Sequence, residues 1–256
     1  MRAHLQTIAL ENLDLHLGIP ISLDPESFYK KIVLGRRGGG CYELNGLFAE
    51  LLRALGYRVD LLSGRVTRPN RVGPEFDHLA LRVEVEGRDW LIDVGFGDGI
   101  REPLELAAGA SEQFGDRSFR LVRSHDYFAL ETSTCGEFDK GYILSPVPRA
   151  LVQFEAVRKR HHDDPRSWFV QTRLATIATP RGRRMLMNER YKTTEGTATR
   201  VRSVSASAYL EVLARDFGIE IDRVPRTKAE WPSMRLLRTA HIWRERATAV
   251  LDRLRG

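Results

Sequence analysis

One cysteine in this sequence stands where a thiol could act as a nucleophile. Cys41 follows the glycine run 38–40 and opens a segment whose apolar residues recur at the spacing of one buried helix face. The start of a helix carries the positive end of its dipole, and Arg36 and Arg37 stand just before it. That setting favours the thiolate, the nucleophilic form of cysteine. A buried, inert Cys41 is the competing interpretation, so the prediction depends on finding a base.

A histidine and a carboxylate that could complete such a site follow on a predicted hairpin. Residues 77–85 alternate as a strand does, with His78 on the face opposite Leu79. A turn over residues 86–89 and a return strand then place Asp93 on the face of His78, displaced by about four residues, so a bulge or strong twist must close the gap. Asp93 stands in an apolar run, where a carboxylate needs a partner.

A thiolate, a histidine and a buried carboxylate together form a nucleophile, its base and the group that orients the base. The glycines before Cys41 would let a large acyl donor approach the sulfur. Backbone N–H groups at the helix start could stabilise a tetrahedral oxyanion. The predicted chemistry is acyl transfer through a thioester, and the acceptor at this stage is either water or an amine.

Three other patterns are weaker candidates. The glycine alternation over residues 95–99 is an incomplete dinucleotide fingerprint, and a tight turn is the simpler interpretation. The run 161–164, His-His-Asp-Asp, would point adjacent side chains apart, so no metal site is predicted. Cys135 stands in a Ser-Thr-Cys-Gly turn and is interpreted as a bystander.

The elements that must position these residues change along the chain. Residues 1–56 are predicted to be mainly helical, and from Tyr57 the period becomes that of strands. A strand is expected over residues 168–172, within a meander that runs to residue 203. Helices are expected over residues 205–217 and 231–254.

Composition limits the class of protein. The 256 residues are 42% hydrophobic and 29% charged, with a net charge of +6, which is typical of a globular chain whose basic surface attracts anionic ligands. No nucleic-acid recognition motif is present, and no apolar run reaches membrane-spanning length. Two cysteines and the lack of a signal pattern predict a cytoplasmic protein without a disulfide framework.

The motifs together resemble one family, the arylamine N-acetyltransferases. The resemblance spans nearly the whole chain, weakens after about residue 190, and includes the 15-residue gap from His78 to Asp93. The segments that carry it are Glu11-Asn12-Leu13-Asp14, His16-Leu17-Gly18, Arg37-Gly38-Gly39-Gly40-Cys41-Tyr42-Glu43-Leu44-Asn45-Gly46-Leu47-Phe48, Asp77-His78-Leu79 and Leu91-Ile92-Asp93-Val94-Gly95-Phe96-Gly97.

The resemblance implies an α+β fold with a cysteine-protease-like catalytic core. Its parts would be an N-terminal helical bundle over 1–56 with Cys41, a central β-barrel over 57–165 with His78 and Asp93, and a C-terminal α/β lid over 166–256. It implies acetyl-CoA as co-substrate, no metal, and a ping-pong reaction. Cys41 would carry the acetyl group to an arylamine or arylhydrazine.

The resemblance also implies binding residues. Phe96 would form a wall of the acceptor pocket, and Gly97 and Gly99 a turn near the path of the cofactor. Two positions depart from the family pattern, because Leu10 replaces a phenylalanine and Gly40 replaces an aromatic residue. The family also has a further helical segment before the part that matches this chain, so the helical bundle is predicted to be N-terminally shortened.

Three alternatives share part of this pattern. A transglutaminase-like enzyme or cysteine hydrolase would use the same three residues without CoA. An amide synthase acting on a carrier-bound polyketide would need a wider cleft. A non-catalytic binding protein would keep Cys41 buried and inert.

Overall fold

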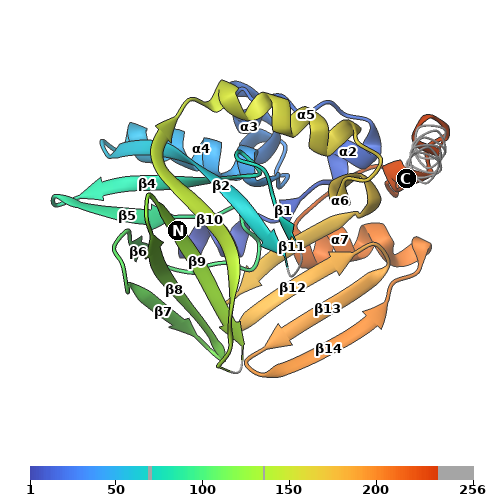
Figure 1. The fold of residues 1–256 in the computed structure, drawn as a ribbon. Helices are drawn as coiled ribbons and strands as arrows, with labels where there is room; N and C mark the ends of the chain where they lie inside the picture. The colour runs from blue at the N-terminus through green and yellow to red at the C-terminus, as the bar shows by residue number, and fades with distance from the viewer. Residues whose placement is uncertain (69–70, 135, 236–256) are drawn as a thin grey trace, which may run out of the picture.

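The computed structural model describes residues 1–68, 71–134 and 136–235 (Figure 1). Most of its helices lie at the N-terminal end of the chain or follow the last strand of the larger sheet. The α-helices are α1 (Arg2–Thr7), α2 (Leu13–Leu17), α3 (Pro25–Phe28), α4 (Cys41–Ala54), α5 (Glu155–Asp163), α6 (Trp168–Gln171) and α7 (Tyr209–Phe217). A π-helical segment continues α3, and three 3₁₀ turns complete the set: Tyr29–Leu34, Leu151–Phe154, Ala206–Ala208 and Lys228–Glu230.

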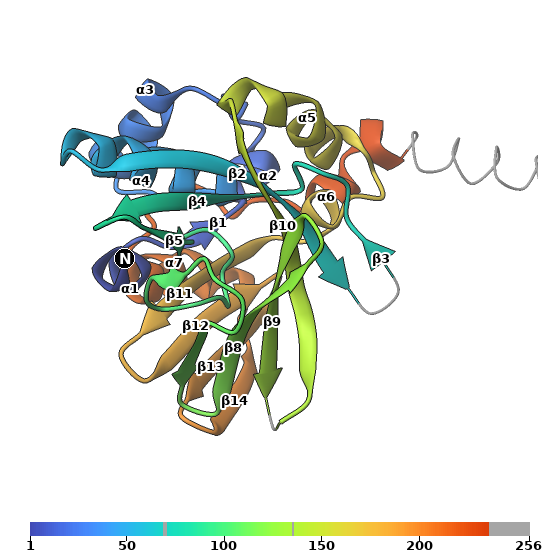
Figure 2. The same cartoon turned by 60° about the vertical axis from the view of Figure 1, so that its left-hand side comes forward.

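The larger of two antiparallel sheets has nine strands and curls into a nearly closed barrel (Figure 2). Its order is β6-β5-β4-β2-β10-β9-β8-β7, with β3 paired to β2. The strands are β2 (Arg58–Arg68), β3 (Arg71–Val72), β4 (His78–Val85), β5 (Arg88–Ile92), β6 (Leu104–Glu105), β7 (Ser111–Phe114), β8 (Arg117–Ser124), β9 (Tyr127–Thr134) and β10 (Phe138–Arg149).

A second sheet has five strands in the order β1-β11-β12-β13-β14. Helix α7 covers one face, and the two share a buried core that includes Ile177, Leu186 and Leu213. The strands are β1 (Leu10–Glu11), β11 (Leu174–Thr179), β12 (Gly182–Met187), β13 (Arg190–Glu195) and β14 (Ala198–Ser203). The fold is therefore α+β, as predicted.

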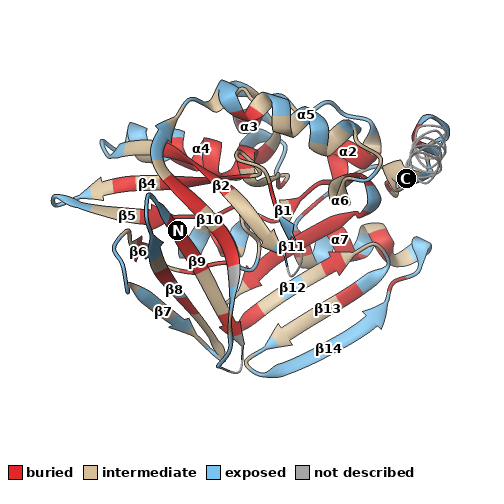
Figure 3. Cartoon of the chain, in the orientation of Figure 1, coloured by how far each residue is buried: buried red, intermediate tan, exposed pale blue. Residues whose placement is uncertain are grey.

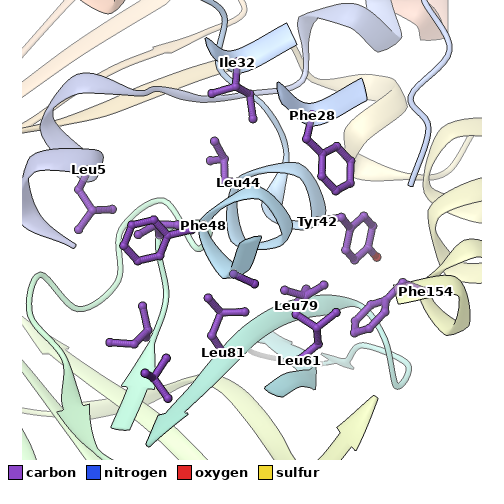
Figure 4. Close-up of a cluster of buried hydrophobic side chains, with 14 of the residues drawn as sticks. Leu5, Phe28, Ile32, Tyr42, Leu44, Phe48, Leu61, Leu79, Leu81 and Phe154 are labelled. Carbon is purple, nitrogen blue, oxygen red and sulfur yellow. The ribbon is translucent and has the colours of Figure 1, made fainter. Parts of the chain in front are cut away.

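Helix α4 forms where the apolar spacing predicted it. The carboxylate of Glu43 accepts a hydrogen bond from the backbone N–H of Gly40 at 2.8 Å, which caps the helix start. Gly56, with φ +91°, lies just beyond the helix end, where a left-handed residue stops a helix. The buried face, including Leu44 and Phe48, packs against Leu79 and other residues of β2 and β4 (Figure 4). Figure 3 shows the same helix with one buried and one exposed side.

The β4–β5 hairpin has a tighter turn than predicted, which corrects the expected register. Val85 pairs with Arg88, so only Glu86 and Gly87 form the turn, and both have positive φ, at 52° and 74°. Two such residues match the twist of a two-residue hairpin. Since Ile92 pairs with Leu81, Asp93 comes level with Ala80 rather than with Arg82. The predicted gap to His78 is therefore halved, and the predicted bulge is not required.

One predicted strand is a helix. Residues 168–171 form α6, because Val170 packs into a small core with Leu15 and Met234 that outweighs the strand preference of Trp-Phe-Val. The predicted strands from 174 to 203 are confirmed as β11–β14. Cys135 and the predicted tail helix beyond residue 235 lie outside the described residues. Within the described part, every helix is too short or too polar to cross a membrane.

Candidate active site

Cys41 is the first residue of α4 and lies against the chain that leaves β5. A Cβ atom placed on Gly95 would come 2.8 Å from the Cα of Cys41 and 2.7 Å from the side-chain nitrogen of Asn45. Only a glycine therefore permits this approach between helix and barrel. The contact places Cys41 beside the segment that carries Asp93.

His78 and Asp93 are in direct contact. Nε2 of His78 lies 2.7 Å from Oδ2 of Asp93, and each residue is only 2% exposed. His78 is the first residue of β4, and Asp93 follows the last residue of β5. The backbone N–H of Gly95 donates to Oδ1 of Asp93 at 2.9 Å, so both carboxylate oxygens are engaged.

This contact sets the charge of the pair. Burial alone would lower the pKa of His78, but the Asp93 charge and hydrogen bonds to Asp93 and Cys41 raise it to about 10. Burial alone would raise the pKa of Asp93, yet the charge and hydrogen bond of His78 hold it below its usual value. Because Nε2 is bonded to Asp93, Nδ1 is the ring nitrogen left for the sulfur of Cys41.

Asn45 is a site residue that the sequence analysis missed. Its side-chain nitrogen donates to Oδ1 of Asp93 at 2.9 Å and to the carbonyl of Leu79 at 2.6 Å, and its oxygen accepts from the N–H of Val94 at 2.9 Å. It is fully buried and lies one helical turn after Cys41. A polar side chain on the apolar face of α4 was the signal that could have identified it.

Aromatic rings enclose the histidine. Phe96 lies edge-on to His78 with ring centres 5.3 Å apart, and Tyr142 of β10 lies 4.9 Å from both rings. Burial and the nearby Asp93 charge raise the pKa of Tyr142 well above its usual value. No local pattern could have predicted Tyr142, because it reaches His78 across the barrel.

The arginines before Cys41 do not have the role expected of them. Arg37 bonds to Glu11 at 2.7 Å and to Asp14 at 2.8 Å, while Arg36 is exposed. Lys31 joins the same buried cluster by contacts of 2.8 Å to Asp14 and 2.9 Å to the Glu43 carboxylate that caps α4. This cluster anchors the start of α4, so Arg37 acts on Cys41 by holding the helix in place.

Two of the three glycines before Cys41 do not provide the access for an acyl donor that the sequence predicted. A Cβ atom on Gly38 would lie 2.1 Å from the carbonyl of Ala9, and one on Gly39 would lie 2.9 Å from the Cβ of Glu43. These two glycines therefore let the chain pack against itself rather than admit a substrate. Gly40 is different, since its nearest neighbour would be 3.7 Å away and it lines the cavity that holds Cys41.

That cavity has a volume of about 570 Å³ and includes Cys41, His78 and Phe96 in its lining. Apolar and aromatic residues form part of the wall, and charged residues form another part. The lining also includes Leu10, Glu11, Arg68, Arg71, Asp77, Arg160, His161, Asp164, Arg166, Trp168, Phe169 and Leu174. A thiol, an imidazole and an aromatic wall therefore share one cavity large enough for a small-molecule substrate.

Comparison with known proteins identifies the family of this chain. The profile of the N-acetyltransferase family matches residues 1–226. The arylamine N-acetyltransferase of Mycolicibacterium smegmatis is 35% identical over 232 residues, which cover 86% of this chain and 82% of that enzyme. The chain belongs to the arylamine N-acetyltransferase family.

Solved structures of other arylamine N-acetyltransferases share the fold. The enzyme from Salmonella typhimurium has a TM-score of 0.81 and 29% identity, covering 91% of this chain and 87% of that chain. The enzyme from Mycobacterium marinum, solved in complex with CoA, has a TM-score of 0.80 and 32% identity, covering 85% of this chain and 83% of that chain. The family relationship therefore holds in both sequence and three-dimensional structure.

A second cavity of about 350 Å³ adjoins the first, and Phe96 lines both. Gly97, predicted from its resemblance to arylamine N-acetyltransferases to lie near the cofactor, lines this second cavity and has φ +85°. Gly99 is buried, and a Cβ atom there would lie 3.3 Å from the Cβ of Phe96. The structure thus places Gly97 at the cavity surface and Gly99 behind the aromatic ring.

The His-His-Asp-Asp run has protein partners. Nε2 of His161 lies 2.7 Å from Oδ1 of Asp77, and Nδ1 of His162 lies 3.3 Å from a guanidinium nitrogen of Arg158. Among the described residues, no group of three or more His, Cys, Asp or Glu side chains could hold a metal ion. His161 instead contributes to the lining of the cavity that holds Cys41.

Proposed function

We propose that this protein transfers the acetyl group of acetyl-CoA to the nitrogen of an arylamine or arylhydrazine, with Cys41 as the acetyl carrier. The observation that carries the proposal is the 2.7 Å contact between His78 and Asp93 at the cavity that Cys41 lines. Cys41 is the nucleophile, His78 its base, and Asp93 the group that orients His78. The family relationship supports the donor and the acceptor class.

In the first half-reaction, His78 takes the thiol proton and the Cys41 sulfur attacks the thioester carbonyl carbon. The new C–S bond forms as the bond to the CoA sulfur breaks, and His78 returns the proton to the departing CoA thiolate. A raised pKa lets His78 hold this proton in a buried site, because Asp93 compensates the imidazolium charge. Backbone N–H groups at the start of α4 stabilise the oxyanion.

In the second half-reaction, the amine nitrogen attacks the acetyl carbon on Cys41. The amide bond forms, the bond to the Cys41 sulfur breaks, and His78 accepts the proton lost by the nitrogen. The departing Cys41 thiolate takes this proton back from His78, which restores the thiol and the imidazole that began the cycle. Phe96 provides a wall for the aromatic acceptor, while Gly97 and Gly99 form the turn beside the donor's path.

The fine organisation belongs to the same proposal. A helical bundle over 1–56 carries the nucleophile, a barrel over 57–165 carries the base and its partner, and residues 166–256 form an α/β lid. The α4–β4 packing supports the proposed resemblance to a cysteine-protease-like core. The low cysteine content supports a cytoplasmic location.

Initial-rate kinetics test the proposal. With acetyl-CoA and an arylamine both varied, a carrier mechanism predicts parallel double-reciprocal lines. It also predicts CoA release without amine that stops after one equivalent. Continued CoA release without amine would indicate a hydrolase, and amide formation only from a carrier-bound acyl group would indicate an amide synthase. Either result would contradict the proposed function.

A further inference from the structure

The residue after Cys41 is bonded to the segment that leads into His78. Tyr42 is 7% exposed, and its hydroxyl donates a hydrogen bond of 2.7 Å to the backbone carbonyl of Phe76. Tyr42 follows the proposed nucleophile directly, and Phe76 precedes the proposed base by two residues. This hydrogen bond therefore forms a short link between the start of α4 and the start of β4.

Phe76 has a backbone conformation that an aromatic residue rarely adopts. It is the third residue of a turn in which the N–H of Asp77 donates to the carbonyl of Pro74 at 3.3 Å, and its φ is 67°. Glycine or asparagine usually occupies a turn position with positive φ, because a larger side chain strains the backbone there. A strained residue of this kind persists only where the surrounding structure holds it.

Aromatic packing supplies part of that hold. Phe154, which is fully buried, lies edge-on to Phe76 with ring centres 5.1 Å apart. The same ring lies edge-on to Tyr42 with ring centres 5.5 Å apart (Figure 4). The guanidinium group of Arg149 lies 5.5 Å from the centre of the Phe76 ring. These rings keep the turn in place, and the hydroxyl of Tyr42 ties it to the helix that carries Cys41.

Tyr42 is suited to a role in holding other residues. Burial first, and then the charges of Cys41 and Asp77, raise the pKa of Tyr42 well above its usual value, so its hydroxyl remains a hydrogen-bond donor. Neither Tyr42 nor Phe76 is among the described residues that line the cavity of Cys41. Tyr42 therefore acts on the reaction from behind the cavity wall, without touching a substrate in that cavity.

We propose that Tyr42 is a positioning residue for acetyl transfer, because its hydrogen bond fixes the distance between the sulfur of Cys41 and the ring of His78. The inference rests on the proposed function, in which His78 takes the thiol proton. Because the two reacting groups lie on separate elements, any shift between α4 and β4 changes the distance over which the proton moves. The close approach of Gly95 holds Cys41 against the segment after β5, and the bond of Tyr42 holds it against the segment before β4.

Tyr42→Phe tests the inference, because it removes the hydroxyl and keeps the ring. We expect acetylation of Cys41, measured as single-turnover CoA release without amine, to slow about tenfold at saturating acetyl-CoA, which corresponds to about 1.4 kcal/mol. This loss is smaller than the roughly 100-fold caused by a 1 Å misplacement, because the packing of the turn remains. The acetyl-CoA concentration at half saturation should stay at its wild-type value, because Tyr42 does not line the cavity.

Alkylation at two pH values separates positioning from a general loss of structure. Iodoacetamide reacts with the thiolate, which at about pH 6 depends on His78 to hold the proton. At about pH 9 a thiol ionises without such help, since a free cysteine ionises near about pH 8.5. Tyr42→Phe should therefore slow alkylation of Cys41 about tenfold at the lower pH and less than about twofold at the higher pH. An equal change at both pH values would assign Tyr42 a general structural role and overturn the inference.

Tyr209→Phe is the matched control. Tyr209 is the first residue of α7 and is 1% exposed, and its hydroxyl has no hydrogen-bond partner within residues 1–68, 71–134 and 136–235. Both substitutions remove one buried hydroxyl, but only that of Tyr42 is bonded to the turn before His78. Tyr209→Phe should leave acetylation and alkylation at their wild-type rates.

Two outcomes of the acetylation assay would overturn the inference. One is a wild-type rate in Tyr42→Phe, and the other is an equal slowing in Tyr42→Phe and Tyr209→Phe. Failure of the proposed function is distinct from both, because it would appear as a wild-type protein that acetyl-CoA does not acetylate, before any variant is compared.

Discussion

Replacement of Gly95 by alanine should disable the site without altering any reacting group. The added Cβ would lie 2.8 Å from the Cα of Cys41, whereas ordinary contacts begin at 3.4 Å. The start of α4 must therefore move by about 0.6 Å or more relative to the barrel, and overpacking of this kind costs about 1–3 kcal/mol. A misplacement of about 1 Å can slow a reaction about 100-fold. We expect acetylation of Cys41 to slow by one to two orders of magnitude.

The assay is stopped-flow release of CoA without amine, at a temperature well below the melting point of the variant. The melting temperature should fall by roughly 2–12 °C, at about 2–4 °C per kcal/mol for a chain of this size. Gly40→Ala is the matched control, because its Cβ would meet its nearest neighbour at 3.7 Å. Wild-type acetylation by Gly95→Ala, at an unchanged melting temperature, would refute the account of how α4 meets the barrel.

Three further predictions concern stability. Asn45→Leu should lower the free energy of unfolding by about 2–4 kcal/mol in urea titrations, because it leaves buried hydrogen-bonding groups without a partner. A loss below about 1 kcal/mol would contradict the role of Asn45. Folding raises the pKa of His78 to about 10, so the free energy of unfolding should fall as pH rises from about 6.5 to 10. The fall should be less steep in Asp93→Asn, and equal slopes in the variant and the wild type would argue against the His78–Asp93 pair. Burial is the main cause that lowers the pKa values of His4 and His16 to about 4, although backbone hydrogen bonds oppose it in His16. The free energy of unfolding should therefore fall as pH drops from about 6.5 to 4, and it should fall less steeply in His16→Gln.

The local parts of the site could be predicted because each depends on a short stretch of sequence. The period of the apolar residues after Cys41 and the stop at Gly56 define α4. The alternation after His78 defines the face that it shares with Asp93. The hairpin register was wrong because it depends on whether two or four residues form the turn, and Glu86 has no strong preference for positive φ.

The long-range parts of the site could not be predicted. Asn45 is bonded to residues 34 and 48 positions away, and the ring of Tyr142 reaches His78 from β10. The charge partners of Arg37 lie more than 20 positions earlier in the chain, so their pairing depends on the completed fold. Sequence spacing therefore predicted the proposed catalytic residues, and tertiary packing determined which residues hold them in place.

The mass of the intact protein shows whether Cys41 carries the acetyl group. The protein is incubated with acetyl-CoA alone, its mass and modified peptide are determined, and an arylamine is then added. We predict one acetyl group, located on Cys41, that disappears as the acetylated amine appears. An acetyl group that persists in Cys41→Ser, or a wild-type protein that turns over without one, would contradict it.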